Sequence, residues 1–329
     1  MSDARENQDH QLRNLDEIRD ATGGPGISRR RLLGIGAVSA ITALAAGIVG
    51  VELVSHGVLP GKSTLDEIDG ACSIPETRLG FTTPGRLYSG SFYSRARHRT
   101  VGYSIGYPPG RALGDELALI VMLHGFGSNH VRPVCGMTPS RALSINDAAI
   151  SKGDMAIVTV DGGGGYWNPH PGDDPMSMVI NELIPRCQRH GLGASPEKTA
   201  LMGISMGGYG ALILAETHPR LFCASAAISP AIWTNYDEAS RANPGAYFSA
   251  SSFASYDAVT HASGLRGIAV RVASGTDDPF HPGVVALARA LPSSAEVRFL
   301  PGCHSASFFL EQLVPSLRFL SASFARARA

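Results

Sequence analysis

The sequence has no excess of charge and none of the short motifs that mark a metal or nucleotide site. Lysine plus arginine and aspartate plus glutamate each number 28 in 329 residues, so the formal net charge is zero. A chain without a basic surplus has no electrostatic attraction for nucleic acid, and this class of partner is excluded. No H-E-x-x-H or Walker pattern occurs, and we expect neither a metal nor a cofactor.

Cysteine is also scarce. The five cysteines include no C-x-x-C pair, which argues against a zinc site and against a dense disulfide framework. A single disulfide is compatible with a chain that lies outside the cytoplasm. Cys72 is then the expected participant, and the sequence leaves its partner open among Cys135, Cys187, Cys223 and Cys303.

The N-terminal region differs in composition from the rest. Residues 1–27 are polar and mixed in charge, which predicts a disordered leader. Residues 28–54 follow and carry three arginines at 29–31 before an uncharged apolar run over 32–51. Paired arginines at this place resemble a twin-arginine export signal, and the run is also long enough to span a bilayer.

Two fates are open for the segment at 28–54. The stretch "SHGVLPGK" just past the apolar run offers no A-x-A cleavage site, which favours an uncleaved transmembrane anchor over a cleaved signal. We expect an exported chain, either anchored at the outer face of the cytoplasmic membrane or secreted after cleavage, because the arginines stay cytoplasmic. The membrane and the twin-arginine export machinery are the implied partners. A linker over 55–77 then leads to a catalytic domain over 78–329.

From residue 78 onward the chain alternates short apolar runs with helical segments, which predicts one α/β domain with a doubly wound, mostly parallel sheet. The basic run at 95–99 separates the first two strands and is expected to be a solvated hairpin tip. The expected strands, of which the first two form an antiparallel pair, are 86–94, 99–109, 117–125, 155–163, 199–205, 223–230, 268–275 and 295–302. The expected helices are 139–151, 176–190, 206–217, 282–291 and 305–327.

Two serines occur in the pattern G-x-S-x-G. Ser104 lies in an alternating apolar run followed by Pro108-Pro109-Gly110, so it is expected to be a serine within a strand. Ser205 lies between an apolar run and a helical segment, which is the strand, turn and helix order of a nucleophile elbow. Gly203, Gly207 and Gly208 would allow the backbones to approach closely there. Ser205 is therefore the candidate nucleophile.

The partners of a serine nucleophile are expected at the ends of later strands, in the order acid and then histidine. Asp277 and Asp278 follow the strand at 268–275, and His304 follows the strand at 295–302. His304 is the candidate general base. Asp278 is favoured as the acid, while Asp277 remains open as an alternative that steadies the loop.

Backbone N–H groups near Ser205 are candidates for an oxyanion hole. The N–H of Met206 is free at a helix N-terminus, and the loop "LHGFGSNH" offers the N–H of Phe126, with Gly127 as the alternative. His124 in the same loop is expected to be a hydrogen-bonded structural residue. Asp161 and the glycines after it are expected to form a turn, with Trp167 as a candidate wall of the site.

With these residues in place, the chain resembles the esterase D family of α/β-hydrolases, which includes feruloyl esterases, S-formylglutathione hydrolases and mycobacterial mycolyltransferase antigens. The resemblance rests on the pieces "LHGFG", "GISMGGYGALILAETHPRLFCASAAISP", "SGTDDPF" and "GCHSASFF". It implies an α/β-hydrolase fold and serine esterase chemistry through an acyl-enzyme. It also implies a triad of Ser205, Asp278 and His304, with Phe126 and Met206 at the oxyanion positions.

The sequence therefore predicts a serine carboxylesterase that hydrolyses a small-molecule or lipid acyl ester. Two other functions remain open. An extracytoplasmic acyltransferase of the mycolyltransferase kind would share the first half-reaction, although that branch carries glutamate as the acid and this chain carries "TDDPF". A non-catalytic cell-surface binding protein would lack an intact triad. The aromatic-rich residues 231–262 are expected to form either a lid or acyl groove or an ordinarily packed loop.

Overall fold

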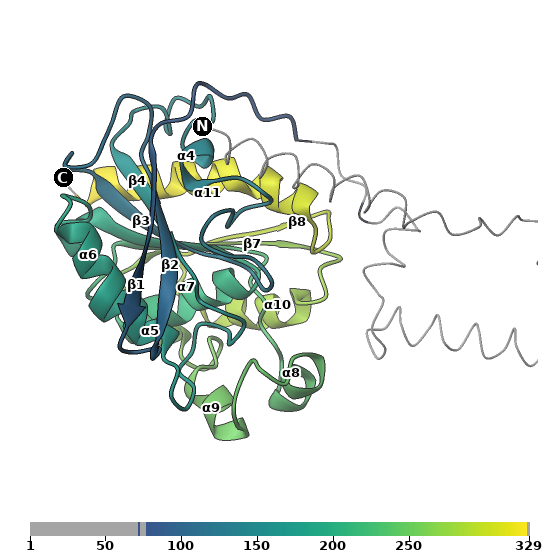
Figure 1. Cartoon of the computed structure of the whole chain (residues 1–329). Coiled ribbons are helices and arrows are strands. Elements are labelled where there is room, and N and C mark those ends of the chain that lie inside the picture. Colours follow the sequence, from purple (N-terminus) through teal and green to yellow (C-terminus); the bar gives the residue numbers. More distant parts are fainter. Residues whose placement is uncertain (1–71, 73–76, 328–329) are drawn as a thin grey trace, which may run out of the picture. The chain divides into compact units, whose positions relative to one another are not determined.

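The computed structural model of the chain describes Cys72 and residues 77–327 (Figure 1). The predicted leader, the predicted signal or anchor at 28–54 and most of the predicted linker lie outside the described residues. In the part that is described, no helix combines the length and the apolar character needed to cross a membrane.

An eight-stranded sheet is the centre of the fold, in the order β1-β2-β4-β3-β5-β6-β7-β8. The first two strands pair antiparallel with each other, β2 pairs antiparallel with β4, and all other pairs are parallel. The doubly wound, mostly parallel sheet that the sequence predicts is thus confirmed. The strands are β1 Leu87–Ser94, β2 Arg99–Gly106, β3 Ala118–Leu123, β4 Met155–Val160, β5 Thr199–Ile204, β6 Ala224–Ile228, β7 Ala269–Gly275 and β8 Glu296–Leu300.

The helices agree less evenly with the prediction. The α-helices are α4 Pro139–Ala142, α5 Pro175–Met178, α6 Ile184–Gln188, α7 Met206–Thr217, α8 Tyr236–Ala242, α9 Ala250–Ser255, α10 His281–Ala290 and α11 Ala306–Arg326. Three of the five expected helices match α7, α10 and α11. The expected helix at 176–190 is divided by a π-helical turn at Val179–Leu183. This π-helical turn lies just before Pro185, which has no N–H to donate the regular α-helical hydrogen bond.

The expectation of a long helix at 139–151 is wrong, because α4 is a single turn. The hydroxyl of Ser144 donates to the carbonyl of Arg141 at 2.9 Å, and a carboxylate oxygen of Asp147 accepts from the N–H of Ala149 at 3.0 Å. Serine and aspartate side chains compete in this way with the backbone bonds of a helix. Turns therefore replace the predicted C-terminal half of this helix.

Two helical layers cover the sheet (Figure 1). Helices α4 and α11 lie on one face, and α5, α6, α7 and α10 lie on the other. Alternate residues of β3 divide between the two cores: Ile120 packs in the core that contains α11 residues, and Val121 in the core that contains α7 residues. Both faces of a central strand are buried, so it reads as a continuous apolar run.

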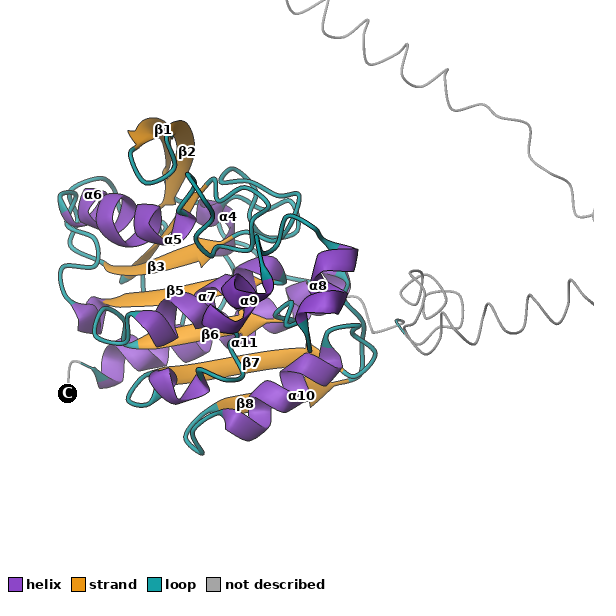
Figure 2. Ribbon diagram, turned by 90° about the horizontal axis from the view of Figure 1, so that it is seen from below, coloured by secondary structure: helices purple, strands orange, loops and turns teal. Residues whose placement is uncertain are grey.

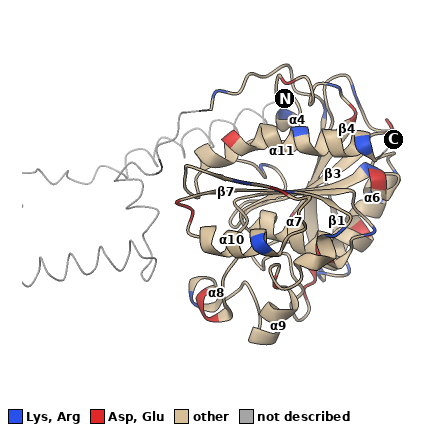
Figure 3. Ribbon diagram, turned by 180° about the vertical axis from the view of Figure 1, so that it is seen from behind, with Lys and Arg blue, Asp and Glu red and all other residues tan. Residues whose placement is uncertain are grey.

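The carboxyl ends of the parallel strands form one edge of the sheet, where doubly wound folds bind ligands. Figure 2 shows α8 beyond this edge. Acidic and basic positions are scattered over the ribbon in Figure 3, with neither sign gathered on one element. This distribution agrees with the zero net charge of the sequence.

Candidate active site

Ser205 occupies a sharp turn between β5 and α7. Its backbone torsions are φ 57° and ψ −122°, in a region that a residue with a Cβ rarely adopts. The N–H of Ser205 donates to the carbonyl of Ile228 at 3.0 Å, and its own carbonyl accepts from Ala231 at 3.1 Å. Bonds to the last residue of β6 and to the loop after it therefore hold the strained serine in place.

Glycine is required on both sides of this turn. A Cβ on Gly203 would overlap the carbonyl oxygen of Gly207, and a Cβ on Gly207 would overlap the carbonyl oxygen of Leu123. At Gly208 the nearest backbone oxygen, that of Ile228, would lie 3.2 Å from a Cβ, so the fit is tight but not blocked. The sequence pattern around Ser205 thus has a steric cause. Ser104, the other serine of the same pattern, is buried within β2 and bonds to Ser89 at 2.8 Å.

His304 lies between Ser205 and Asp278. Its Nε2 is 2.8 Å from the hydroxyl oxygen of Ser205, and its Nδ1 is 2.8 Å from Oδ2 of Asp278. A carboxylate only accepts, so Nδ1 carries the proton and Nε2 accepts from the serine hydroxyl. The three side chains come from the ends of β5, β7 and β8, and they form one continuous series of hydrogen bonds.

Asp278, rather than Asp277, faces the histidine. The side chain of Asp278 is fully buried, and its Oδ1 accepts from the N–H of Phe280 at 2.8 Å. Asp277 is half-buried and instead accepts from the hydroxyl of Thr276 at 3.0 Å. The geometry thus separates two neighbouring carboxylates that the sequence does not distinguish.

Two phenylalanine rings enclose the imidazole of His304. The ring of Phe280 lies 5.2 Å from it and that of Phe309 lies 5.0 Å from it, both edge to face. Neither ring was predicted from the sequence to be part of the site. The only sequence signal for them is position: Phe280 lies two residues after the acid, and Phe309 lies in the first turn of α11. This signal does not identify a site residue, because aromatic residues at such places are equally typical of ordinary packing.

The N–H groups of Met206 and Phe126, the candidate oxyanion donors, lack hydrogen-bond partners among residues 77–327. Met206 is the first residue of α7, where N–H groups have no partner within the helix. The oxyanion loop, residues 124–130, approaches the serine directly, since a Cβ on Gly125 would lie 3.6 Å from the Cβ of Ser205. Met206 thus directly follows the nucleophile, and the loop that carries Phe126 passes close to it.

His124 fixes the start of the oxyanion loop. Its Nε2 accepts from the N–H of Gly162 at 3.0 Å, so its Nδ1 carries the proton and donates to the carbonyl of Gly125 at 2.8 Å. Burial lowers the pKa of this imidazole and keeps it neutral. A trans peptide points its N–H away from its C=O, so anchoring the Gly125 carbonyl also directs the N–H of Phe126.

The loop after β4 is hydrogen-bonded to the oxyanion loop. Asp161 accepts from Nδ1 of His130 at 2.8 Å and from the N–H of Gly102 at 3.1 Å. Trp167 is fully buried, and its indole N–H donates to the carbonyl of His124 at 3.2 Å. The glycine-rich loop is thus a turn, as expected, while Trp167 packs beneath the site instead of forming its open wall.

The expected solvated hairpin tip at 95–99 is only partly solvated. Arg97 is 4% exposed, and it donates to Asp173 at 2.6 and 2.9 Å and to the carbonyl of Asp161 at 2.6 Å. The expectation is wrong for this residue because a planar guanidinium can satisfy a carboxylate and a carbonyl together. Arg97 thereby ties the hairpin between β1 and β2 to the loop beside the site.

The aromatic-rich residues 231–262 contain α8 and α9. Tyr247 is buried against Tyr166 and Tyr209, which is ordinary packing. Trp233 packs edge to face on Phe280 at 4.8 Å, and Phe280 in turn contacts His304. The insertion therefore mainly packs on the domain and reaches the site through one pair of rings.

A cavity of about 450 Å³ lies elsewhere, near the amino ends of β6 and β7. Its lining includes Cys223, Ala269 and Arg326. The nucleophile lies at the carboxyl ends of the strands, so this cavity is separate from the candidate active site.

The sheet order, the nucleophile turn and the hydrogen-bond series together define the class of α/β-hydrolases. The family model described as "Putative esterase" matches residues 96–319. The chain belongs to this family and is an ester-hydrolysing serine hydrolase, which confirms the resemblance to the esterase D family. None of the curated proteins matches the chain.

Solved structures share the fold at low sequence identity. A ferulic acid esterase is 19% identical, with a TM-score of 0.60 over 74% of this chain and 100% of its own. An S-formylglutathione hydrolase from Agrobacterium tumefaciens is 17% identical, with a TM-score of 0.59 over 76% of this chain and 100% of its own. The fluorophosphonate-binding serine hydrolase FphF from Staphylococcus aureus is 16% identical, with a TM-score of 0.57 over 72% and 99%.

Proposed function

We propose that this chain is an exported serine carboxylesterase that hydrolyses acyl esters through Ser205, His304 and Asp278 and an acyl-enzyme intermediate. The observation that carries the proposal is the position of His304, whose two nitrogens lie 2.8 Å from Ser205 and from Asp278. The imidazole can therefore move a proton while the buried carboxylate holds its orientation.

In the first half-reaction, the hydroxyl oxygen of Ser205 attacks the ester carbonyl and its proton passes to Nε2 of His304. The N–H groups of Met206 and Phe126 donate to the oxygen that becomes negative, and the N-terminus of α7 adds its positive end. The tetrahedral species then collapses. Nε2–H gives its proton to the leaving alcohol, and the acyl group remains on Ser205.

In the second half-reaction, a water molecule replaces the alcohol. Neutral His304 takes a proton from the water, whose oxygen attacks the acyl carbon and again places negative charge in the oxyanion hole. Collapse releases the acid and returns the proton to Ser205. Asp278 stabilises the imidazolium in both halves without being protonated itself.

Export is supported by two features. The arginine-led apolar segment at 28–54 resembles a twin-arginine signal. A disulfide between Cys72 and Cys303 is typical of proteins outside the reducing cytoplasm. The substrate is then an ester of an extracytoplasmic small molecule or lipid, and the membrane is reached through the N-terminal segment.

The test is turnover of p-nitrophenyl esters of increasing acyl length by the full-length chain, with Ser205→Ala as the comparison. We expect the wild type to hydrolyse at least part of the series and the variant to lose at least about 10⁴-fold in kcat/KM. A fluorophosphonate probe followed by mass spectrometry should label Ser205 alone. A folded wild type that neither turns over an ester nor reacts with the probe contradicts the proposal.

A further inference from the structure

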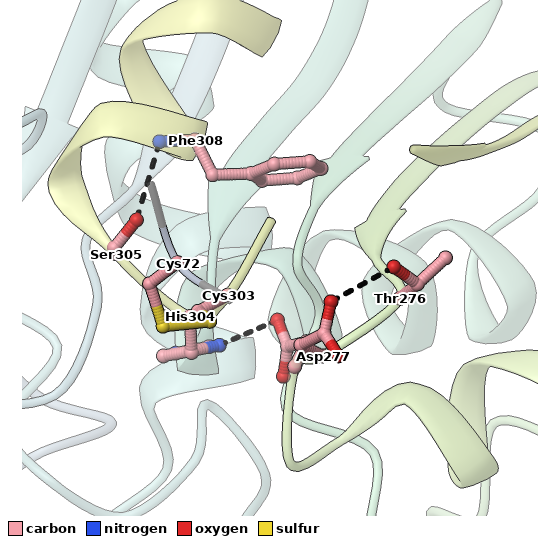
Figure 4. The surroundings of a disulfide bond; sticks show 8 residues. Cys72, Thr276, Asp277, Cys303, His304, Ser305 and Phe308 are labelled. Carbon is pink, nitrogen blue, oxygen red and sulfur yellow. Dashed lines mark hydrogen bonds and ion pairs between the residues drawn. A yellow bond between two sulfur atoms is a disulfide. The ribbon is translucent and has the colours of Figure 1, made fainter. Parts of the chain in front are cut away.

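A disulfide lies immediately beside the histidine of the candidate site. Cys303 precedes His304 in the chain and is bonded to Cys72, which is 231 residues earlier. Figure 4 shows the two sulfur atoms next to the imidazole of His304. The bridge therefore joins the predicted linker before the catalytic domain to the loop that holds the general base of the proposed function.

The loop between β8 and α11 is held on one side by the loop of the acid. The N–H of Asp277 donates to the carbonyl of Gly302 at 3.0 Å, and the N–H of Thr276 donates to that of Leu300 at 2.8 Å. A Cβ on Gly275 would overlap the Gly302 carbonyl, so the two backbones are already in contact. These bonds stop at Gly302, one residue before the disulfide.

The next two residues have no backbone bond to the loop of the acid, and the only backbone bond there among the described residues is local, from the N–H of Ser305 to the carbonyl of Cys303 at 2.9 Å. Neither Cys303 nor His304 donates its backbone N–H to another residue of the described part of the chain. The backbone becomes regular again at Ser305, whose hydroxyl accepts from Phe308 at 3.4 Å and caps α11 (Figure 4). Among the described residues, the disulfide to Cys72 is therefore the one bond that ties Cys303 to a distant part of the chain, and Cys303 is itself buried at 2% exposure.

We infer that the Cys72–Cys303 disulfide positions His304 for reaction, so that Cys303 and Cys72 are positioning residues of the esterase site. The inference rests on the proposed function of His304. Losing the bridge frees the backbone at Cys303 and lets the imidazole leave the 2.8 Å contact with Ser205. A displacement of about 1 Å in a catalytic group lowers turnover by as much as 10²-fold.

The same geometry makes the activity dependent on the redox state. A dithiol such as dithiothreitol delivers two electrons and two protons to the bridge and is itself converted to a cyclic disulfide. Cys72 and Cys303 become thiols. The three other cysteines are free, so this is the only bond that the reagent breaks among the described residues.

The test compares Cys72→Ser and the double variant Cys72→Ala/Cys303→Ala with the wild type, all as full-length chains. Cys135→Ala is the matched control, because Cys135 is not bridged but its thiol contacts the carbonyl of Ala306 at 3.7 Å, in the same neighbourhood. We expect kcat for a p-nitrophenyl ester to fall about 10- to 100-fold in both bridge variants, with KM changed less than about 3-fold. The control should keep wild-type values.

Proton NMR provides a second readout that does not require a substrate. The proton between Nδ1 of His304 and the buried Asp278 should resonate far downfield in the oxidised wild type. It should broaden or disappear in the bridge variants while their circular dichroism is retained. A structural disulfide without a positioning role would leave this resonance and kcat unchanged at temperatures below unfolding, and that result overturns the inference.

Dithiothreitol titration of the wild type covers the case in which the variants do not fold. Loss of activity before any loss of circular dichroism, reversed on reoxidation, is the expected result; a parallel loss of both contradicts positioning. A wild type that hydrolyses no ester and does not react with a fluorophosphonate rejects the proposed function. A bridge variant with full activity rejects this inference alone.

Discussion

The backbone N–H of Gly162 donates a hydrogen bond of 3.0 Å to Nε2 of His124. This contact joins the glycine-rich loop after β4 to the oxyanion loop after β3. It also assigns the proton of His124 to Nδ1, which faces the carbonyl of Gly125. One contact beside the site thus determines which way a proposed oxyanion donor points.

Substitutions of His124 should separate its two hydrogen bonds. An asparagine amide can take the place of Nδ1 and still donate to Gly125, whereas a glutamine amide reaches the place of Nε2 and can accept from Gly162. We expect His124→Asn to keep kcat within about 5-fold and His124→Gln to lose about 10²-fold, the usual effect of losing an oxyanion donor. Steady-state kinetics with a p-nitrophenyl ester measure both.

Equal losses in both His124 variants would contradict this role. Melting temperatures of the two variants serve as the control, because both substitutions remove part of a buried ring. A similar melting temperature with unequal kcat assigns the difference to the direction of the Phe126 N–H rather than to packing.

Asp278 and Asp277 form a natural matched pair. Asp278→Asn keeps the shape of the side chain but donates where His304 needs an acceptor, so the imidazole takes the wrong tautomer. We expect kcat to fall by about 10⁴-fold, as in other serine triads. Asp277→Asn should stay within about 3-fold of the wild type. An active Asp278→Asn enzyme would remove Asp278 from the proposed mechanism.

Glu216 should make stability depend on pH. Its carboxyl is buried without a hydrogen-bond partner among the described residues, and burial followed by the charge of Asp257 raises its pKa to about 8 from 4.5. The folded state keeps this proton up to pH 8, while the unfolded state releases it near 4.5. The free energy of unfolding therefore falls as the pH rises between these values, by at most roughly 5 kcal/mol.

Glu216→Gln should remove this fall in the free energy of unfolding with rising pH, because the amide does not ionise. Urea unfolding at pH 5, 7 and 9 is the measurement. We expect the free energy of unfolding of the variant to increase relative to that of the wild type as the pH rises. Parallel pH profiles for the two proteins would show that Glu216 is ionised in the folded state.

The nucleophile turn should tolerate no side chain at Gly207. Gly207→Ala places a Cβ onto the carbonyl oxygen of Leu123, which is backbone and cannot move aside. We expect a loss of about 3 kcal/mol in the free energy of unfolding, at the upper end of overpacking effects. Gly208→Ala, with its nearest backbone oxygen at 3.2 Å from the new Cβ, should lose only about 1 kcal/mol. Similar losses in both would refute the steric explanation.

The sheet was predictable from the sequence because its central strands, β3 to β7, are buried on both faces and end in or just before glycine, aspartate, serine or histidine. The order of Ser205, Asp278 and His304 along the chain predicted which strand ends to compare, and the structure brings these residues together. Distances were not predictable: the two adjacent aspartates differ only in the direction of their side chains.

Other features depend on contacts across the fold. The partner of Cys72 is 231 residues away, and no local pattern selects Cys303 over the remaining cysteines. Arg97 is buried because Asp173, a residue of a distant loop, meets its guanidinium. Helices α8 and α9 are short and depend on side-chain caps from Asn235 and Ser249 rather than on a clear apolar stripe.

Helix α11 begins two residues after His304 and covers one face of the sheet through Phe308, Leu313 and Leu317. During synthesis, Ser205 leaves the ribosome 99 residues before His304 does. A nascent chain that ends before α11 has a bare apolar sheet face and a serine without its base. We therefore expect the proposed triad to assemble only after α11 has been made and has packed on the sheet.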